Sequence, residues 1–210
     1  MPIYSLNTPY TTFTNSLNRS YNLVSKVNNV PAKYLNKYKK DDILELAFLM
    51  VYKSWENFLA ESFLRYMAGA SSISGKQPER YVNTNTIEKS RYLLMGEKNS
   101  NRIIPWAGEF VRQKSIVYFK NGEPFESPLS AITTYLSEIK TIRNTIAHGS
   151  KESKAKFQKL VNSKLTNFTG RMKPGTLLSK TKPNENPVIT FFEYYCKKLE
   201  LASYNISFYR

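Results

Sequence analysis

The sequence predicts an all-α protein. Apolar residues recur every three or four positions in several segments, and no segment shows the sustained apolar and polar alternation of a half-buried strand. No internal repeat is visible. A chain of 210 residues is long enough to bury one sizeable core, so we expect a single helical domain over residues 1–210.

A first amphipathic helix is predicted near the N-terminus. Its apolar positions are Phe13, Leu17, Tyr21, Val24 and Val27. Pro31 would end it, because proline cannot continue a helix. The lysine-rich residues 32–40 that follow are expected to form a turn or a short solvated segment.

A second, longer helix is predicted over residues 41–69. Asp41 and Asp42 can cap its start, and Gly69 can end it. Its apolar residues surround most of the helix, which suggests burial on two sides, against the core and against a second chain. One semi-polar stripe remains, formed by Glu45, Tyr52, Glu56 and Phe63. A carboxylate in such a stripe needs a partner.

Loops and shorter helices follow. Residues 70–86 are rich in Ser, Gly, Pro and Asn and predict a loop, and residues 87–96 and 106–119 predict two short helices. A strong amphipathic helix is expected from Pro128 to near Gly149.

Two further helices are predicted in the C-terminal part of the chain. One covers residues 151–165, and the last opens at Asn186-Pro187 with Val188 as its first apolar position.

Charge and cysteine content limit the functional classes. With 31 Lys+Arg against 16 Asp+Glu, the net charge of +15 favours polyanionic partners, although a solvated lysine surface would look the same. The single cysteine, Cys196, fits a reducing cytosol and a role as core filler. Residues 1–12 do not resemble a secretory signal, and residues 43–52 are too short to span a membrane. A cytoplasmic protein is therefore expected.

The segment IRNTIAHGS, residues 142–150, holds the only histidine and the only Arg-Asn pair of the chain. On a helical wheel Asn144 and His148 lie about 40° apart on the polar side, and Arg143 lies at the border of the apolar stripe. His148 is therefore not expected in the core. A surface histidine at a helix end, where the helix dipole stabilises a positive charge, stays an open alternative.

These residues resemble the motif of the HEPN domain family, in which an arginine and a polar residue precede a histidine four to six positions beyond the arginine. Here the motif reads R-N-T-I-A-H, which matches Arg143, Asn144 and His148. Residues 49–64 are similar to the family's other central helix, with an aromatic-Glu pair at Trp55-Glu56. RiboL-PSP-like and related stand-alone HEPN groups are the most similar.

The resemblance implies an antiparallel helical bundle that dimerises about a two-fold axis with the motif helices facing each other. It also implies a metal-independent endoribonuclease that acts as a toxin or in phage defence, with RNA as substrate and an antitoxin or regulatory protein as a further partner. HEPN toxins silenced by a nucleotidyltransferase carry tyrosine two residues after the histidine. Ser150 stands there in this chain, so control through that tyrosine is not expected.

The chemistry of these residue types agrees with this reading. Cleavage through the 2′-OH needs a base, an acid and a cation beside the phosphorane, and histidine and arginine can supply them. Because each chain has one histidine, we hypothesise that His148 acts twice, once from each protomer. Arg143 would bind the scissile phosphate, and Asn144 would orient His148 or the phosphate. Glu56 would hold Arg143 or His148, although a structural salt bridge is an equal alternative.

A basic segment follows the motif directly. Residues 151–182 contain nine Lys/Arg and one acid, so Lys151 and Lys154 are candidate RNA-binding residues, with a solvated helix face as the alternative.

Other site types are not predicted. No ligand spacing for a metal site, no GxSxG serine and no complete phosphate loop occurs, so neither a metal nor a cofactor is expected. A non-catalytic HEPN-type module that binds RNA or a partner protein remains the second hypothesis.

Overall fold

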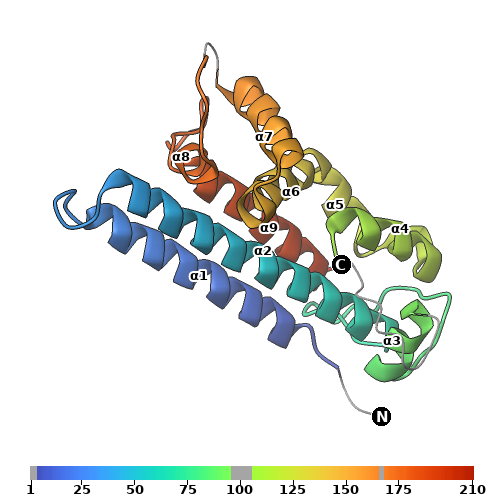
Figure 1. Cartoon of the computed structure of the whole chain (residues 1–210). Helices are drawn as coiled ribbons and strands as arrows, with labels where there is room; N and C mark the ends of the chain where they lie inside the picture. The colour runs from blue at the N-terminus through green and yellow to red at the C-terminus, as the bar shows by residue number, and fades with distance from the viewer. Residues whose placement is uncertain (1–3, 96–105, 166–167) are drawn as a thin grey trace. The chain divides into compact units, whose positions relative to one another are not determined.

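The computed structural model describes residues 4–95, 106–165 and 168–210, and it confirms the all-α prediction. Within these ranges the chain forms helices joined by loops, and the strand-like pairings are three isolated bridges (Figure 1). The helices are α1 (Asn7–Asn29), α2 (Lys37–Met67), α3 (Ile87–Met95), α4 (Gly108–Tyr118), the 3-10 turn η1 (Lys120–Gly122), α5 (Glu126–Ala131), α6 (Thr133–His148), α7 (Lys151–Lys164), α8 (Pro174–Leu178) and α9 (Phe191–Ser207). None of the described helices is long and apolar enough to cross a membrane.

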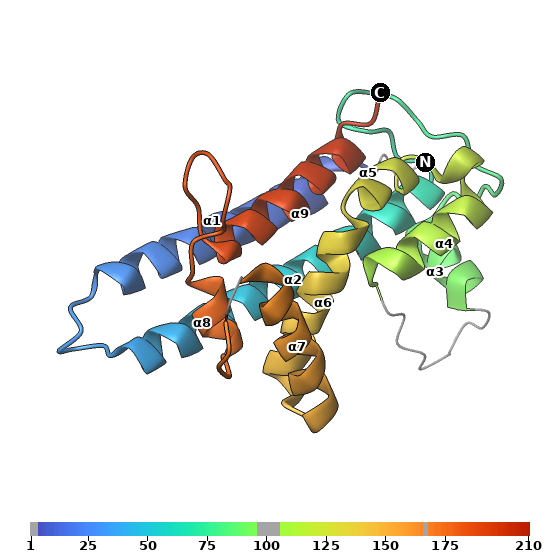
Figure 2. The ribbon, with the colours of Figure 1, turned by 90° about the horizontal axis from the view of Figure 1, so that it is seen from above.

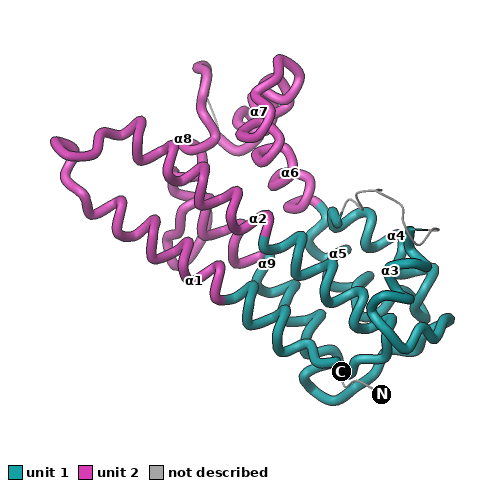
Figure 3. Tube along the Cα trace, turned by 60° about the horizontal axis from the view of Figure 1, so that its bottom comes forward, with its two compact units in different colours: residues 1–14, 54–133, 199–210 teal, residues 15–53, 134–198 magenta. Residues whose placement is uncertain are grey.

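The chain divides into two compact units, shown in different colours in Figure 3. Unit 1 comprises residues 1–14, 54–133 and 199–210, and unit 2 comprises residues 15–53 and 134–198. Helices α1, α2 and α9 contribute residues to both units. In unit 1 the ring of Phe63 packs against the rings of Phe119 and Phe125. In unit 2 the ring of Phe192 packs against Phe48 and Tyr21.

Helix α2 begins earlier than predicted. The side chain of Asn36 accepts a hydrogen bond from the backbone N–H of Lys39 at 3.0 Å, which is the geometry of a helix N-cap. The assignment of Asp41 and Asp42 as caps was therefore wrong. Asp41 is buried, and its carboxylate accepts a hydrogen bond at 2.6 Å from the hydroxyl of Thr176 in α8. Gly69 follows the end of α2 with φ of +100°, as expected for a helix stop.

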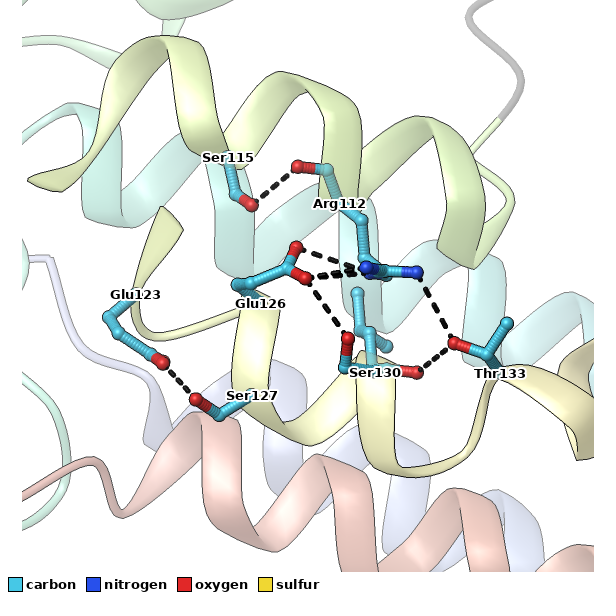
Figure 4. A network of polar contacts seen from close by, with 8 residues as sticks. Arg112, Ser115, Glu123, Glu126, Ser127, Ser130 and Thr133 are labelled. Atoms are coloured by element: carbon cyan, nitrogen blue, oxygen red, sulfur yellow. Dashed lines mark hydrogen bonds and ion pairs between the residues drawn. The ribbon is translucent and has the colours of Figure 1, made fainter. Parts of the chain in front are cut away.

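The helix predicted from Pro128 to Gly149 is broken into α5 and α6. Ile132 leaves helical geometry, with φ of −115° and ψ of 14°. Arg112 of α4 contacts residues on both sides of the break (Figure 4): its Nε donates to both carboxylate oxygens of Glu126, and its Nη1 donates to Thr133 Oγ1 at 3.3 Å. One planar guanidinium thus fixes α5 and the first residue of α6 against α4.

Helix α9 begins later than predicted, at Phe191 instead of Asn186-Pro187. Thr190 and Glu193 form a reciprocal capping box, in which each side chain accepts a hydrogen bond from the backbone N–H of the other residue. Val188 precedes the helix and is 76% exposed, so it does not belong to the apolar face. The prediction missed this cap because Asn-Pro is also a common helix start.

The motif helix α6 is held in unit 2 by a buried carboxylate. Glu138 accepts a hydrogen bond from Tyr195 of α9 at 2.9 Å, and it forms an ion pair with Lys164 of α7 at 2.5 Å. Burial, together with the charge of Glu138, raises the pKa of the Tyr195 hydroxyl far above its usual range, so this hydroxyl acts as a donor. One acidic side chain thereby connects three helices.

The short helix α8 was not predicted, and it packs closely on α2. The backbone N–H of Gly175 donates to Glu45 Oε1 at 2.8 Å. A Cβ atom at Gly175 would overlap the backbone carbonyl of Asp41. Glycine is therefore required at this position by the approach of two backbones.

We expect Gly175→Ala to destabilise the protein by about 1–3 kcal/mol, because α8 must move away from α2 to make room for the methyl group. Thermal melting would measure this loss. Ser179→Ala, at the exposed end of the same helix, should change stability by less than about 0.5 kcal/mol. Equal melting temperatures for the two variants would contradict the close packing of α8.

Candidate functional site

The only histidine of the chain is the last residue of α6. Gly149 ends the helix with φ of +55°, and its N–H donates to the carbonyl of Thr145 at 3.0 Å. Ser150 caps α7 by accepting a hydrogen bond from the N–H of Ser153 at 3.1 Å. Helix α7 then returns beside α6, as both ribbon views show (Figures 1 and 2). A tight turn therefore presents His148 between two antiparallel helices.

The structure brings the three motif residues into contact. Nη1 of Arg143 lies 3.3 Å from Nε2 of His148 and 3.1 Å from Oδ1 of Asn144. Arginine has only donors, so Nε2 of the imidazole accepts, and a neutral ring carries its proton on Nδ1. His148 is exposed, as the helical wheel predicts, and Arg143 and Asn144 are half-buried.

The ring of Tyr52 on α2 contacts the guanidinium of Arg143. The guanidinium carbon of Arg143 lies 5.5 Å from the centre of the Tyr52 ring, and Tyr52 is buried. Such a cation–π contact orients the guanidinium and leaves its edges available. Sequence analysis placed Tyr52 in the semi-polar stripe but did not assign it to the site. Its position four residues before Glu56 was the signal that could have identified it.

A hollow of about 510 Å³ lies beside the motif, and we call it the histidine hollow. Its lining residues come from α6, α7 and the turn between them: Ser137, Lys140, Thr141, Asn144, His148, Ser150, Glu152, Ser153 and Lys156. Lys156 forms an ion pair with Glu152 at 2.6 Å, which partly neutralises this wall. The hollow is polar and open to solvent.

The remaining predicted site residues lie elsewhere. Lys151 and Lys154 line a second hollow, of about 660 Å³, on the other side of α7. The lysines that line the histidine hollow are Lys140 and Lys156. Glu56 is half-buried and belongs to unit 1, whereas the motif belongs to unit 2. No hydrogen bond or ion pair of Glu56 is found among the described residues, and its role stays a prediction.

No cluster of three or more potential metal ligands occurs among residues 4–95, 106–165 and 168–210. Comparison of the chain with protein-family models, with curated proteins and with solved structures gave no match.

The Arg143 contact predicts the tautomer of His148. In its neutral form the ring should carry its proton on Nδ1, and in Arg143→Met the proton should shift towards Nε2 because the donor to Nε2 is lost. Nitrogen-15 NMR would show this without ambiguity, since the chain has one histidine. Lys140→Met removes a charge from the same hollow without touching the ring and should leave the tautomer unchanged. The same tautomer in Arg143→Met and wild type would contradict the contact.

Proposed function

We propose that this protein is a metal-independent endoribonuclease of the HEPN type, a toxin or phage-defence effector that works as a two-fold homodimer. An antitoxin or regulatory protein would restrain it. The contact of Arg143 with His148 carries this proposal, because it joins a phosphate-binding group to a proton-transfer group at the edge of an open polar hollow.

The guanidinium keeps unused donors for a phosphate. Nη1 serves His148 and Asn144, whereas Nε and Nη2 of Arg143 have no partner among the described residues. A bound phosphate would compete for Nη1 as well, because a charged acceptor is stronger than a neutral imidazole. Substrate binding would then release Nε2 of His148 as a base. Until a phosphate binds, the contact with Arg143 would therefore keep Nε2 of His148 from accepting a proton.

The reaction needs two proton transfers. His148 of one protomer would take the proton of the 2′-OH, whose oxygen then attacks phosphorus. His148 of the partner subunit, protonated, would give its proton to the leaving 5′-oxygen as the phosphorus–oxygen bond breaks. The products are a 2′,3′-cyclic phosphate and a 5′-hydroxyl end. Arg143 would neutralise the charge on the phosphorane, and Asn144 would keep the guanidinium in place.

We expect His148→Ala and Arg143→Ala each to lower the rate of RNA cleavage in EDTA by at least about 100-fold, because each removes a proton carrier or the cation beside the phosphate. Cleavage of end-labelled RNA measures this, and the matching 2′-O-methyl strand should stay intact. Lys26→Ala, an exposed lysine of α1, is the control and should cut like wild type. Binding without cutting by wild type would instead favour a non-catalytic HEPN-type module that binds RNA or a partner protein.

If two protomers share one site, inactive chains should inhibit RNA cleavage by wild-type chains. Excess His148→Ala should suppress wild-type cleavage, because a mixed dimer has one histidine where two are needed. An equal excess of an unrelated basic protein should not suppress it. Sedimentation of the mixture would show whether dimers form. If the activity per wild-type chain is unchanged when His148→Ala protein is added, a composite site is ruled out.

A further inference from the structure

The second hollow in unit 2 is a separate site candidate, and we call it the α7 cleft. It has a volume of about 660 Å³, and its walls come from α2, α6, α7 and the segment that leads into α8. Pockets for small molecules range from roughly 300 to 1,000 Å³, so a ligand with two rings and a charged group fits this volume.

The α7 cleft and the histidine hollow lie on opposite sides of α7. The cleft is lined by Lys151, Lys154, Ala155 and Gln158, and the hollow is lined by Glu152, Ser153 and Lys156. At 100° per residue these two sets occupy opposite faces of one helix. A ligand in the cleft therefore does not touch His148.

Part of the lining of the cleft, which we call its floor, is apolar. Ile146 of α6, Phe157 of α7, and Met172 and Pro174 of the segment before α8 contribute it. Phe157 and Pro174 are buried, so the floor is part of the packed core and not a mobile surface. Apolar and aromatic walls with a few polar groups are the usual composition of a ligand pocket.

Unpaired cations also line the cleft. Lys151, Lys154 and Arg171 are exposed and have no acidic partner among the described residues. Lys173 is partly neutralised by Asp42, at 3.8 Å. Three free positive charges beside an apolar floor are complementary to an amphipathic anion, with its ring system inside and its charge at the mouth.

Glu45 narrows the class of ligand. Its Oε1 accepts the N–H of Gly175 at 2.8 Å, and Oε2 has no partner among the described residues. An acceptor in the wall disfavours the anionic end of a fatty acid, and it favours a ring that carries an amino group.

We infer that the α7 cleft binds a nucleotide unit, with the base on the apolar floor, its amino group donating to Glu45, and its phosphate between Lys154 and Arg171. The unit is either a free mononucleotide or one nucleotide of a single-stranded RNA. This assignment does not depend on cleavage at His148, because the two hollows share no lining residue.

The test uses the His148→Ala protein, so that cleavage cannot interfere, and titrates it calorimetrically with adenylate, uridylate, adenosine and inorganic phosphate. Adenylate should bind at least about tenfold more tightly than adenosine or phosphate, because both ends of the site are then used. Uridylate, whose base has no amino group, should bind about fivefold more weakly than adenylate.

Matched variants locate the binding. Lys154→Ala should weaken adenylate binding about fivefold to tenfold, whereas Lys159→Ala, exposed on the same helix but lining neither hollow, should change it less than about twofold. Ala155→Trp fills the cleft from an exposed helical position and should abolish binding. Glu45→Gln keeps an acceptor for Gly175 and should reduce the preference for adenylate over uridylate. Melting curves verify that each variant folds.

A single-stranded 2′-O-methyl RNA identifies the source of the nucleotide. If Ala155→Trp weakens binding of this RNA and no mononucleotide binds to the protein, the nucleotide unit belongs to RNA. If Ala155→Trp weakens binding of the mononucleotide alone, the ligand is a free mononucleotide. Adenylate binding that is equal in Ala155→Trp and Lys159→Ala, phosphate binding as tight as adenylate, or no binding of any nucleotide or RNA would overturn the inference. Failure of RNA cleavage with intact nucleotide binding would count against the proposed ribonuclease alone.

Discussion

The carboxylate of Glu138 is the interaction on which the geometry of unit 2 depends. A buried carboxylate is costly unless hydrogen bonds and a counter-charge compensate it. Lys164 and Tyr195 provide both, from α7 and α9. Since Glu138 lies five residues before Arg143 on α6, this pairing fixes the rotation of the helix that carries the motif. On the same helix, the guanidinium carbon of Arg143 lies 5.5 Å from the centre of the Tyr52 ring of α2.

Arg143 is the second constraint, because one guanidinium has more possible partners than it can satisfy at once. Its Nη1 already serves His148 and Asn144, and its ring contact with Tyr52 restricts its movement. A phosphate would exchange the imidazole contact for a charge-assisted one at small cost in side-chain entropy, since the guanidinium is held in place beforehand. Under the proposed function, the contact with His148 would be present without substrate and would be lost when a phosphate binds.

Local rules predicted the parts of the site that depend on neighbours in sequence. The exposure of His148, its place at the end of α6 and the stop at Gly149 follow from helical periodicity and glycine geometry. Tertiary contacts decided the rest. The predicted helix is interrupted at Ile132, next to the Arg112 contact with Thr133. Asp41 accepts a hydrogen bond from Thr176 and does not cap a helix start. No periodicity reveals such partners, because they lie far away in the sequence.

The distribution of charge also depends on tertiary contacts that the sequence does not reveal. The basic segment 151–182 predicts a polyanion partner in general, and the structure sorts its charges into two groups. Four of the nine basic residues, Lys156, Lys164, Lys173 and Lys182, have an acidic partner within 4 Å.

The three that line the α7 cleft, apart from Lys173, have none among the described residues. Paired lysines contribute little to the field outside the molecule, so the potential that attracts an anion is strongest where unpaired charges converge. In the described part of unit 2, Lys151, Lys154 and Arg171 converge beside an apolar floor, away from His148.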